Sequence, residues 1–222
     1  MPAFAHAVGL GYRYLETDAH LTADGVVVAF HDDVLDRVTD RSGAISDLPW
    51  AEVARARVDG EPIPRLADLL ATWPEVRVNI DPKHDAVVGP LADLLHRTNS
   101  VDRVCIGSFS DQRLAELRRR LGPRLCTSLG PTGTARLKAA SWRAPVGRMR
   151  APCAQVPVAS RGVVITDQRF VAAAHRRRIQ VHVWTIDDPA EMHRLLDLGV
   201  DGIMTDQPAV LKEVLESRGL WD

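Results

Sequence analysis

The chain alternates short apolar runs with helical patterns along nearly its whole length, and this rhythm constrains its fold more than any other feature. Strands that alternate with helices are typical of a parallel sheet with crossover helices. At 222 residues the chain is long enough for one large α/β domain and short for two, so we expect one domain over residues 1–222. The strand-like runs lie at residues 14–18, 26–30, 76–81, 104–108, 125–128, 154–156, 163–165, 180–184 and 202–205. The helical patterns lie at residues 66–72, 87–97, 111–121, 168–178, 189–198 and 209–217.

One segment departs from this parallel order. Asp24 and Gly25 are a strong signal for a two-residue turn, and the strand-like residues Leu21 and 26–28 flank them. We therefore expect a small hairpin directly after the strand at 14–18. This hairpin would return His31 to the neighbourhood of the preceding strand.

Carboxylates cluster where the predicted strands end. Glu16 and Asp18 are two residues apart in a strand and so share a face, where their charges repel. A hard divalent cation such as Mg²⁺ or Ca²⁺ would remove this repulsion, and Asp81 supplies a third carboxylate. Lys83 follows, and its ammonium is suited to a phosphate oxygen. The alternative is structural, with Glu16 paired to a lysine and Asp18 capping a loop.

His31 is the main candidate for proton transfer. It follows an apolar run, and Asp32 or Asp33 is placed to orient its imidazole or to raise its pKa. His20 lies near the carboxylates and is the main competitor for a second proton-transfer role.

Charge and cysteine usage limit the class of partner. With 28 basic and 29 acidic side chains, the net charge of −1 gives no general attraction to nucleic acid or to an anionic membrane. Two arginine runs, at residues 118–120 and 176–178, fit solvated helix ends better than nucleic-acid contacts. The three cysteines lack the spacing of a metal site and fit thiols in a reducing cytoplasm. No apolar run reaches 18 residues, so we expect no spanning helix and no stable membrane anchor.

Taken in their order along the chain, these motifs resemble those of a known protein family. The segment ETD at 16–18, followed by LTADGVVV at 21–28 and His31-Asp32, resembles the glycerophosphodiester phosphodiesterase family, whose pattern runs ExD, then TxDGxxV, then HD. Segments 184–186 and 205–208 favour this family over the related sphingomyelinase D-like barrel phospholipases. The match continues through residues 37–39, Gly43 and residues 79–83, 108–110, 181–186 and 199–208.

The resemblance implies a TIM (β/α)8 barrel with a small inserted hairpin after the strand that carries Glu16 and Asp18. It further implies hydrolysis of a small glycerophosphodiester to an alcohol and glycerol 3-phosphate with a divalent cation, Mg²⁺ or Ca²⁺. By position, the implied metal ligands are Glu16, Asp18 and Asp81, and the implied catalytic acid or base is His31. Lys83 corresponds to a phosphate contact and Trp184 to part of the wall beside the glycerol. The head group and the oligomeric state are not assigned.

The N-terminus departs from the family pattern. The family has a first strand ending in His-Arg-Gly and a loop with Pro-Glu-Asn-Thr, whereas residues 1–5 are similar to the helix after that loop. We therefore expect a barrel without its first strand and about 25–30 residues short of the usual length. A histidine, an arginine and a glutamate would be missing, so we expect little turnover from the chain as given. The alternatives are a fragment of a working phosphodiesterase or a non-catalytic binder of metal and phosphodiester.

Overall fold

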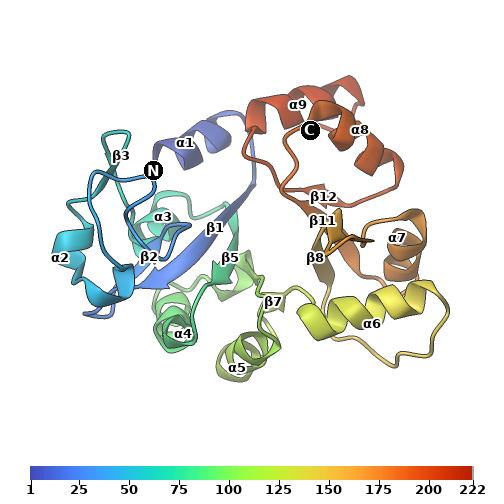
Figure 1. The fold of residues 1–222 in the computed structure, drawn as a ribbon, viewed down its shortest axis with the longest axis horizontal. Coiled ribbons are helices and arrows are strands. Elements are labelled where there is room, and N and C mark those ends of the chain that lie inside the picture. Colours follow the sequence, from blue (N-terminus) through green and yellow to red (C-terminus); the bar gives the residue numbers. More distant parts are fainter. Residues whose placement is uncertain (222) are drawn as a thin grey trace. The chain divides into compact units, whose positions relative to one another are not determined.

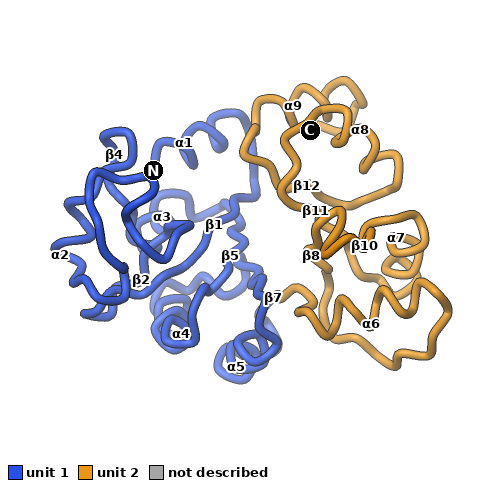
Figure 2. The backbone as a smooth tube through the Cα atoms, viewed as in Figure 1, with its two compact units in different colours: residues 1–126 blue, residues 127–222 orange. Residues whose placement is uncertain are grey.

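The computed structural model describes residues 1–221, which fall into two compact units that divide after Cys126 (Figure 2). Each unit combines strands with covering helices, as the sequence rhythm predicts. The expectation of a single domain over residues 1–222 stays a prediction.

The first unit contains a five-stranded sheet in the order β2-β1-β5-β6-β7 (Figure 1). Its central strands are parallel, since β1 pairs with β5 and β5 with β6, whereas β2 runs antiparallel to β1. The strands are β1 (Tyr14–Leu21), β2 (Val27–Ala29), β5 (Arg77–Pro82), β6 (Val104–Ile106) and β7 (Cys126–Thr127). The helices are α1 (Pro2–Gly9), α3 (Leu66–Thr72), α4 (Val88–Arg97) and α5 (Asp111–Leu121).

Helical periodicity explains how these helices cover the sheet. In α5 the leucines at 114, 117 and 121 are buried, a three-to-four-residue spacing that places them on one face. They join a buried cluster that includes Val78 and Ile80 of β5 and Ile106 of β6. Ser110 caps the start of α5 by accepting a hydrogen bond from the Arg113 amide, and Gly122 ends the helix with a positive φ of 75°. Local sequence and core packing therefore agree on the position of this helix.

The predicted hairpin is present, with a longer turn than expected. Leu21 pairs with Val27, and the Thr22 amide donates to the Val26 carbonyl, which leaves a three-residue loop from Ala23 to Gly25. Gly25 has a φ of 86°, a conformation that costs glycine little. The Asp24 carboxylate accepts from the Thr22 hydroxyl and from the Trp50 amide. The Asp24-Gly25 dipeptide thus closes the hairpin as the last two residues of a three-residue loop.

A small insertion lies between the hairpin and α3. It holds α2 (Trp50–Val53) and a short antiparallel pair, β3 (Arg57–Val58) and β4 (Glu61–Pro62). These elements are too short to show a sequence period, and none was predicted. Their apolar side chains pack against the hairpin in a cluster of their own, made by Val28, Leu35, Ile45, Val53, Ala56 and Ile63.

The second unit contains a three-stranded parallel sheet, with β11 (Gln180–Trp184) between β8 (Cys153–Pro157) and β12 (Gly202–Ile203). The run at 163–165 was predicted to be a strand in this series. It instead gives β10 (Val163–Val164), which forms an exposed hairpin with β9 (Ala159–Ser160). The helices of this unit are α6 (Pro131–Ser141), α7 (Gln168–His175), α8 (Pro189–Asp197) and α9 (Pro208–Ser217). No helix in the described residues has the length and apolar character needed to cross a membrane.

Candidate active site

The carboxyl ends of β1 and β5 bring two predicted site residues together. The parallel register pairs Asp18 with Asp81 directly, and it pairs Glu16 with Asn79 two residues earlier. The chain then leaves β5 in contact with β1, because the Lys83 amide donates to the Ala19 carbonyl at 3.1 Å. Catalytic residues of α/β barrels gather at this end of their strands.

Lys83 lies between the two aspartates. Its Nζ is 2.8 Å from Asp18 Oδ1 and 3.4 Å from Asp81 Oδ2. The side chains of Asp18 and Asp81 are only 9% and 14% exposed, and that of Lys83 is 25% exposed. The two carboxylates are therefore largely withdrawn from water, and one ammonium compensates both of them.

The pKa values reflect this imbalance of charge. Burial raises the pKa of Asp81 above its ordinary value, and the neighbouring Asp18 raises it further, against the lowering effect of the Lys83 ammonium. Burial lowers the pKa of Lys83, but its hydrogen bonds and charge contacts with Asp18 and Asp81 outweigh this, and the pKa is raised overall. The cluster holds more negative than positive charge and would gain from a further cation.

The donor set of this cluster fits a hard divalent ion. Asp18 and Asp81 present carboxylate oxygens, the ligand type that Mg²⁺ and Ca²⁺ prefer. Glu16 precedes Asp18 by two residues on the same strand and so belongs to the same face, where it is exposed. The described contacts join Asp18 and Asp81 through Lys83, and the participation of Glu16 stays a prediction.

His31 is held by its neighbour Asp32. The imidazole Nδ1 lies 2.6 Å from Asp32 Oδ1, and Arg37 donates to both oxygens of the same carboxylate, at 2.6 and 2.8 Å. The Arg37 hydrogen bonds, with the one from His31, hold the pKa of Asp32 well below its usual range. A permanently charged Asp32 keeps the proton on Nδ1, so Nε2 of the 75%-exposed imidazole is the nitrogen that can exchange a proton.

Backbone contacts join the segment around His31 to β1. The amide of Phe30, its predecessor, donates to the Asp18 carbonyl at 3.1 Å, and His20 Nε2 lies 3.2 Å from the His31 carbonyl oxygen. The end of the hairpin is thus attached to β1 at Asp18. The residues predicted for proton transfer and for cation binding lie in one unit of the chain.

Arg113 is a supporting residue that sequence analysis missed. One guanidinium nitrogen donates to the carbonyls of Pro82 and Lys83, at 3.0 and 2.7 Å, and another lies 2.6 Å from Asp85 Oδ1. These bonds fix the segment that presents Lys83. These contacts join residues about thirty positions apart in the sequence, so no local sequence pattern predicts them. Arg37, by contrast, lies in a family motif five residues after Asp32, where an ion pair could have been anticipated.

Trp184, the predicted wall of the glycerol site, belongs to the second unit. It is the last residue of β11 and pairs in register with Pro157 of β8. It is thus at the carboxyl end of a parallel strand, as Asp81 is in the other unit. Its contact with substrate stays a prediction.

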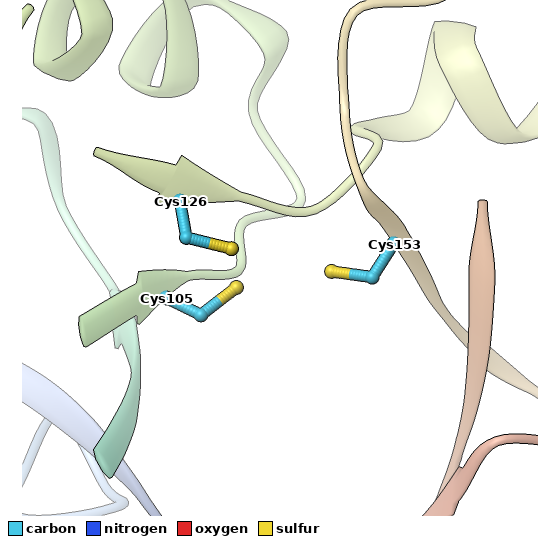
Figure 3. A group of neighbouring side chains, drawn as sticks. All are labelled: Cys105, Cys126 and Cys153. Atoms are coloured by element: carbon cyan, nitrogen blue, oxygen red, sulfur yellow. The ribbon is translucent and has the colours of Figure 1, made fainter. Parts of the chain in front are cut away.

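The three cysteines lie on three strands, and their reduced state stays a prediction. Cys105 on β6 and Cys126 on β7 have sulfur atoms within 4.8 Å of each other, whereas Cys153 begins β8 in the second unit (Figure 3). Among the described residues, none of the three forms a disulfide.

Comparison with known proteins now identifies the family. The family model described as the glycerophosphoryl diester phosphodiesterase family matches residues 1–210. The "Probable glycerophosphodiester phosphodiesterase 2" of Mycobacterium tuberculosis is 42% identical, in an alignment that spans 100% of this chain and 86% of that protein.

Solved structures agree with this family match. A putative glycerophosphoryl diester phosphodiesterase from Silicibacter pomeroyi has a TM-score of 0.81 at 24% identity, covering 99% of this chain and 88% of that one. A phosphodiesterase from Oleispira antarctica, solved with the product sn-glycerol-3-phosphate, has a TM-score of 0.77 at 19% identity, covering 96% and 90%. The expected α/β fold of TIM-barrel type is therefore confirmed, and the chain belongs to the glycerophosphoryl diester phosphodiesterase family.

Proposed function

We propose that this chain hydrolyses small glycerophosphodiesters to an alcohol and glycerol 3-phosphate with the help of a divalent cation. The observation that carries the proposal is the cluster of Asp18, Asp81 and Lys83, which lies in the same unit as a histidine hydrogen-bonded to Asp32. Family membership and the glycerol 3-phosphate bound to the Oleispira antarctica neighbour support the choice of substrate class.

The proposed cation is Mg²⁺ or Ca²⁺, held by Glu16, Asp18 and Asp81. When bound, such an ion supplies charge neutralisation for the phosphate and lowers the pKa of a coordinated hydroxyl. The surplus negative charge of the aspartate cluster, seen in the raised pKa of Asp81, is consistent with this assignment.

The other residues have roles that follow from their chemistry. Lys83 would donate to a phosphate oxygen and stabilise the charge that develops there as the diester is cleaved. His31 would exchange a proton through Nε2, a step that is typically worth about 10²–10⁴ in rate. Asp32 and Arg37 keep the imidazole in position, and Trp184 would line the glycerol site.

A substrate panel tests the activity directly. The chain is assayed with glycerophosphocholine, glycerophosphoethanolamine, glycerophosphoglycerol and lysophospholipids, with Mg²⁺, with Ca²⁺ or with EDTA. We expect at least one glycerophosphodiester to release glycerol 3-phosphate, with the low turnover expected of the chain as given, and we expect EDTA to abolish the release. Preferred release of a phosphorylated alcohol other than glycerol 3-phosphate would contradict the substrate assignment.

Variants separate the two roles of the site. His31→Ala is expected to remove nearly all turnover with substrate binding kept, while His96→Ala, a substitution of an exposed histidine on α4, is expected to leave turnover intact. Asp18→Asn is expected to weaken Mg²⁺ or Ca²⁺ binding in a calorimetric titration. Retention of more than about a tenth of kcat by His31→Ala would exclude the acid or base role.

The same assays decide between an enzyme and a binder. A chain that binds cation and glycerophosphodiester without releasing glycerol 3-phosphate would be a non-catalytic binder. The lack of the barrel's first strand, expected from the family pattern, also stays a prediction, and the codons that precede the Met1 codon test it. A cytoplasmic location likewise remains a prediction, tested by fractionation.

A further inference from the structure

Two histidines and an aspartate meet beside the hairpin. His84 Nε2 lies 3.1 Å from Asp33 Oδ1, and His20 Nδ1 lies 3.8 Å from the same oxygen. The three ligand atoms lie within 4.8 Å of one another, and the two imidazole rings are tilted with centroids 5.4 Å apart. The residues come from three separate segments, β1, the loop after β2 and the turn after β5. Their meeting is therefore a product of the fold and not of sequence proximity.

His20 has the protonation state of a metal ligand. Its side chain is 2% exposed, and its Nε2 lies 3.2 Å from the His31 carbonyl oxygen, a group that can only accept a hydrogen bond. Nε2 therefore carries the proton, and Nδ1, which faces Asp33 and His84, offers a lone pair. A metal-binding histidine commonly donates its second ring N–H to a backbone carbonyl in this way.

The distances suit a small tetrahedral ion. Zn²⁺ binds nitrogen and oxygen at about 2.0–2.1 Å, so two ligand atoms of a tetrahedral site lie roughly 3.3–3.4 Å apart. The separations of Asp33 Oδ1 from the two imidazole nitrogens, 3.1 and 3.8 Å, bracket this value. The side chains of Asp33 and His84 are 66% and 47% exposed, so an ion can enter from solvent and the ligands can adjust.

We propose that His20, Asp33 and His84 form a binding site for a divalent transition-metal ion such as Zn²⁺, separate from the carboxylate site of Asp18 and Asp81. Two imidazoles and one carboxylate are a donor set that Zn²⁺ accepts, with water as a fourth ligand. Mg²⁺ and Ca²⁺ prefer oxygen ligands and therefore do not compete for it.

The site would act on the segment that carries His31. An ion bound here joins Asp33, two residues after His31, to β1 through His20 and to the turn after β5 through His84. These three segments of the first unit would then share one coordination centre. Zn²⁺ is thus expected to raise the melting temperature of the chain, because it binds the folded state alone.

A calorimetric titration of the full chain with Zn²⁺ tests the proposal, with excess Mg²⁺ present to occupy the carboxylate site. We expect His84→Gln and Asp33→Asn each to raise the Kd for Zn²⁺ by at least about tenfold, since even outer partners of metal ligands typically matter by 10–100-fold. Both side chains are exposed, so these variants preserve the buried His20 and the fold. Asp81→Asn, His96→Gln and Cys126→Ser are the controls, and each is expected to leave this Kd unchanged.

Co²⁺ provides an independent measurement. The parent chain is expected to give the intense visible bands of four-coordinate Co²⁺, and His84→Gln is expected to lose them. An unchanged Zn²⁺ affinity in both His84→Gln and Asp33→Asn would overturn the proposal and leave only a hydrogen-bonded pair. Loss of Zn²⁺ binding in Asp81→Asn or Cys126→Ser would assign the ion to another site. Every readout is binding without substrate, so the outcome is independent of the proposed hydrolysis.

Discussion

Replacing Lys83 with methionine should expose the electrostatic conflict within the aspartate cluster. The substitution keeps much of the side-chain volume and removes the ammonium between Asp18 and Asp81. Two largely buried carboxylates then face each other without compensation. In the absence of divalent cations, we expect the free energy of unfolding at pH 7 to fall by about 2–3 kcal/mol.

That magnitude lies between two limits. Removing one partner from a fully buried ion pair costs about 3–5 kcal/mol, whereas an exposed pair contributes about 0.2–1 kcal/mol. Lys83 is 25% exposed and its partners are 9% and 14% exposed, which places the cluster nearer the buried limit. Against a total stability of roughly 5–15 kcal/mol, the loss is large enough to measure easily.

Urea unfolding followed by tryptophan fluorescence in EDTA gives the comparison. The double variant Lys83→Met/Asp81→Asn should recover at least half of the loss, because it removes one of the two opposed charges. Arg65→Met is the control, since it deletes a cation from a half-exposed pair with Asp68 and should cost less than about 1 kcal/mol.

Acid should relieve the same conflict. The folded-state pKa of Asp81 is already raised above 3.8, and loss of the Lys83 ammonium raises it further. A carboxyl group with a raised folded pKa stabilises the fold below its unfolded pKa, and this stabilisation is lost as the pH rises through the folded value. The penalty of Lys83→Met should therefore be small near pH 4 and full at pH 7. An equal penalty at both pH values, or no recovery in the double variant, would refute the electrostatic explanation.

Two further predictions concern catalysis and packing. Asp32→Asn should lower kcat by at least about tenfold with little change in KM, because a neutral amide holds the His31 imidazole less firmly than a charged carboxylate does. An unaltered kcat in a steady-state assay would show that Asp32 does not position His31 for catalysis. Gly202→Ala should destabilise the chain by about 1–3 kcal/mol in urea, because the added methyl would lie 3.0 Å from a ring carbon of His182. Gly9→Ala is its matched control, since the added methyl meets open space in α1 and should leave stability equal or raise it by about 0.5–1 kcal/mol. Equal effects of the two alanines would contradict the packing argument.

Sequence patterns predicted most of the fold because the local sequence of a helix indicates where the helix begins and ends. Residues 66–72 and 111–121 were predicted as helices and are α3 and α5 with the same bounds. Strand ends were less accurate, because a strand ends where its partner does: the run at 104–108 gives only Val104–Ile106. The run at 163–165 forms a strand as predicted but lies outside the parallel series, because its apolar residues pair in a local hairpin after two residues with positive φ, Arg161 and Gly162.

The contacts of the candidate site were likewise predictable only in part. The meeting of Asp18, Asp81 and Lys83 was predictable because each lies at or near the end of an apolar run, and parallel strand ends meet at one edge. The contacts of Arg113 and of His84 were not, because they join segments about thirty and fifty residues apart that no periodicity relates. His84 looks like an ordinary turn residue until the fold places Asp33 beside it.

In the hairpin that leads to His31, the pairing of the two strands depends more on the length of the loop than on its amino-acid composition. Val27–Ala29 is held to β1 by residue-by-residue pairing, so one residue inserted between Ala23 and Gly25 would either bulge out or slip that pairing by one place. A slip reverses which face of the sheet every following side chain of the strand occupies. Two inserted residues would restore the face but displace His31 along the strand by roughly 6–7 Å. Substitutions in this turn are thus expected to accumulate during evolution far more readily than insertions or deletions.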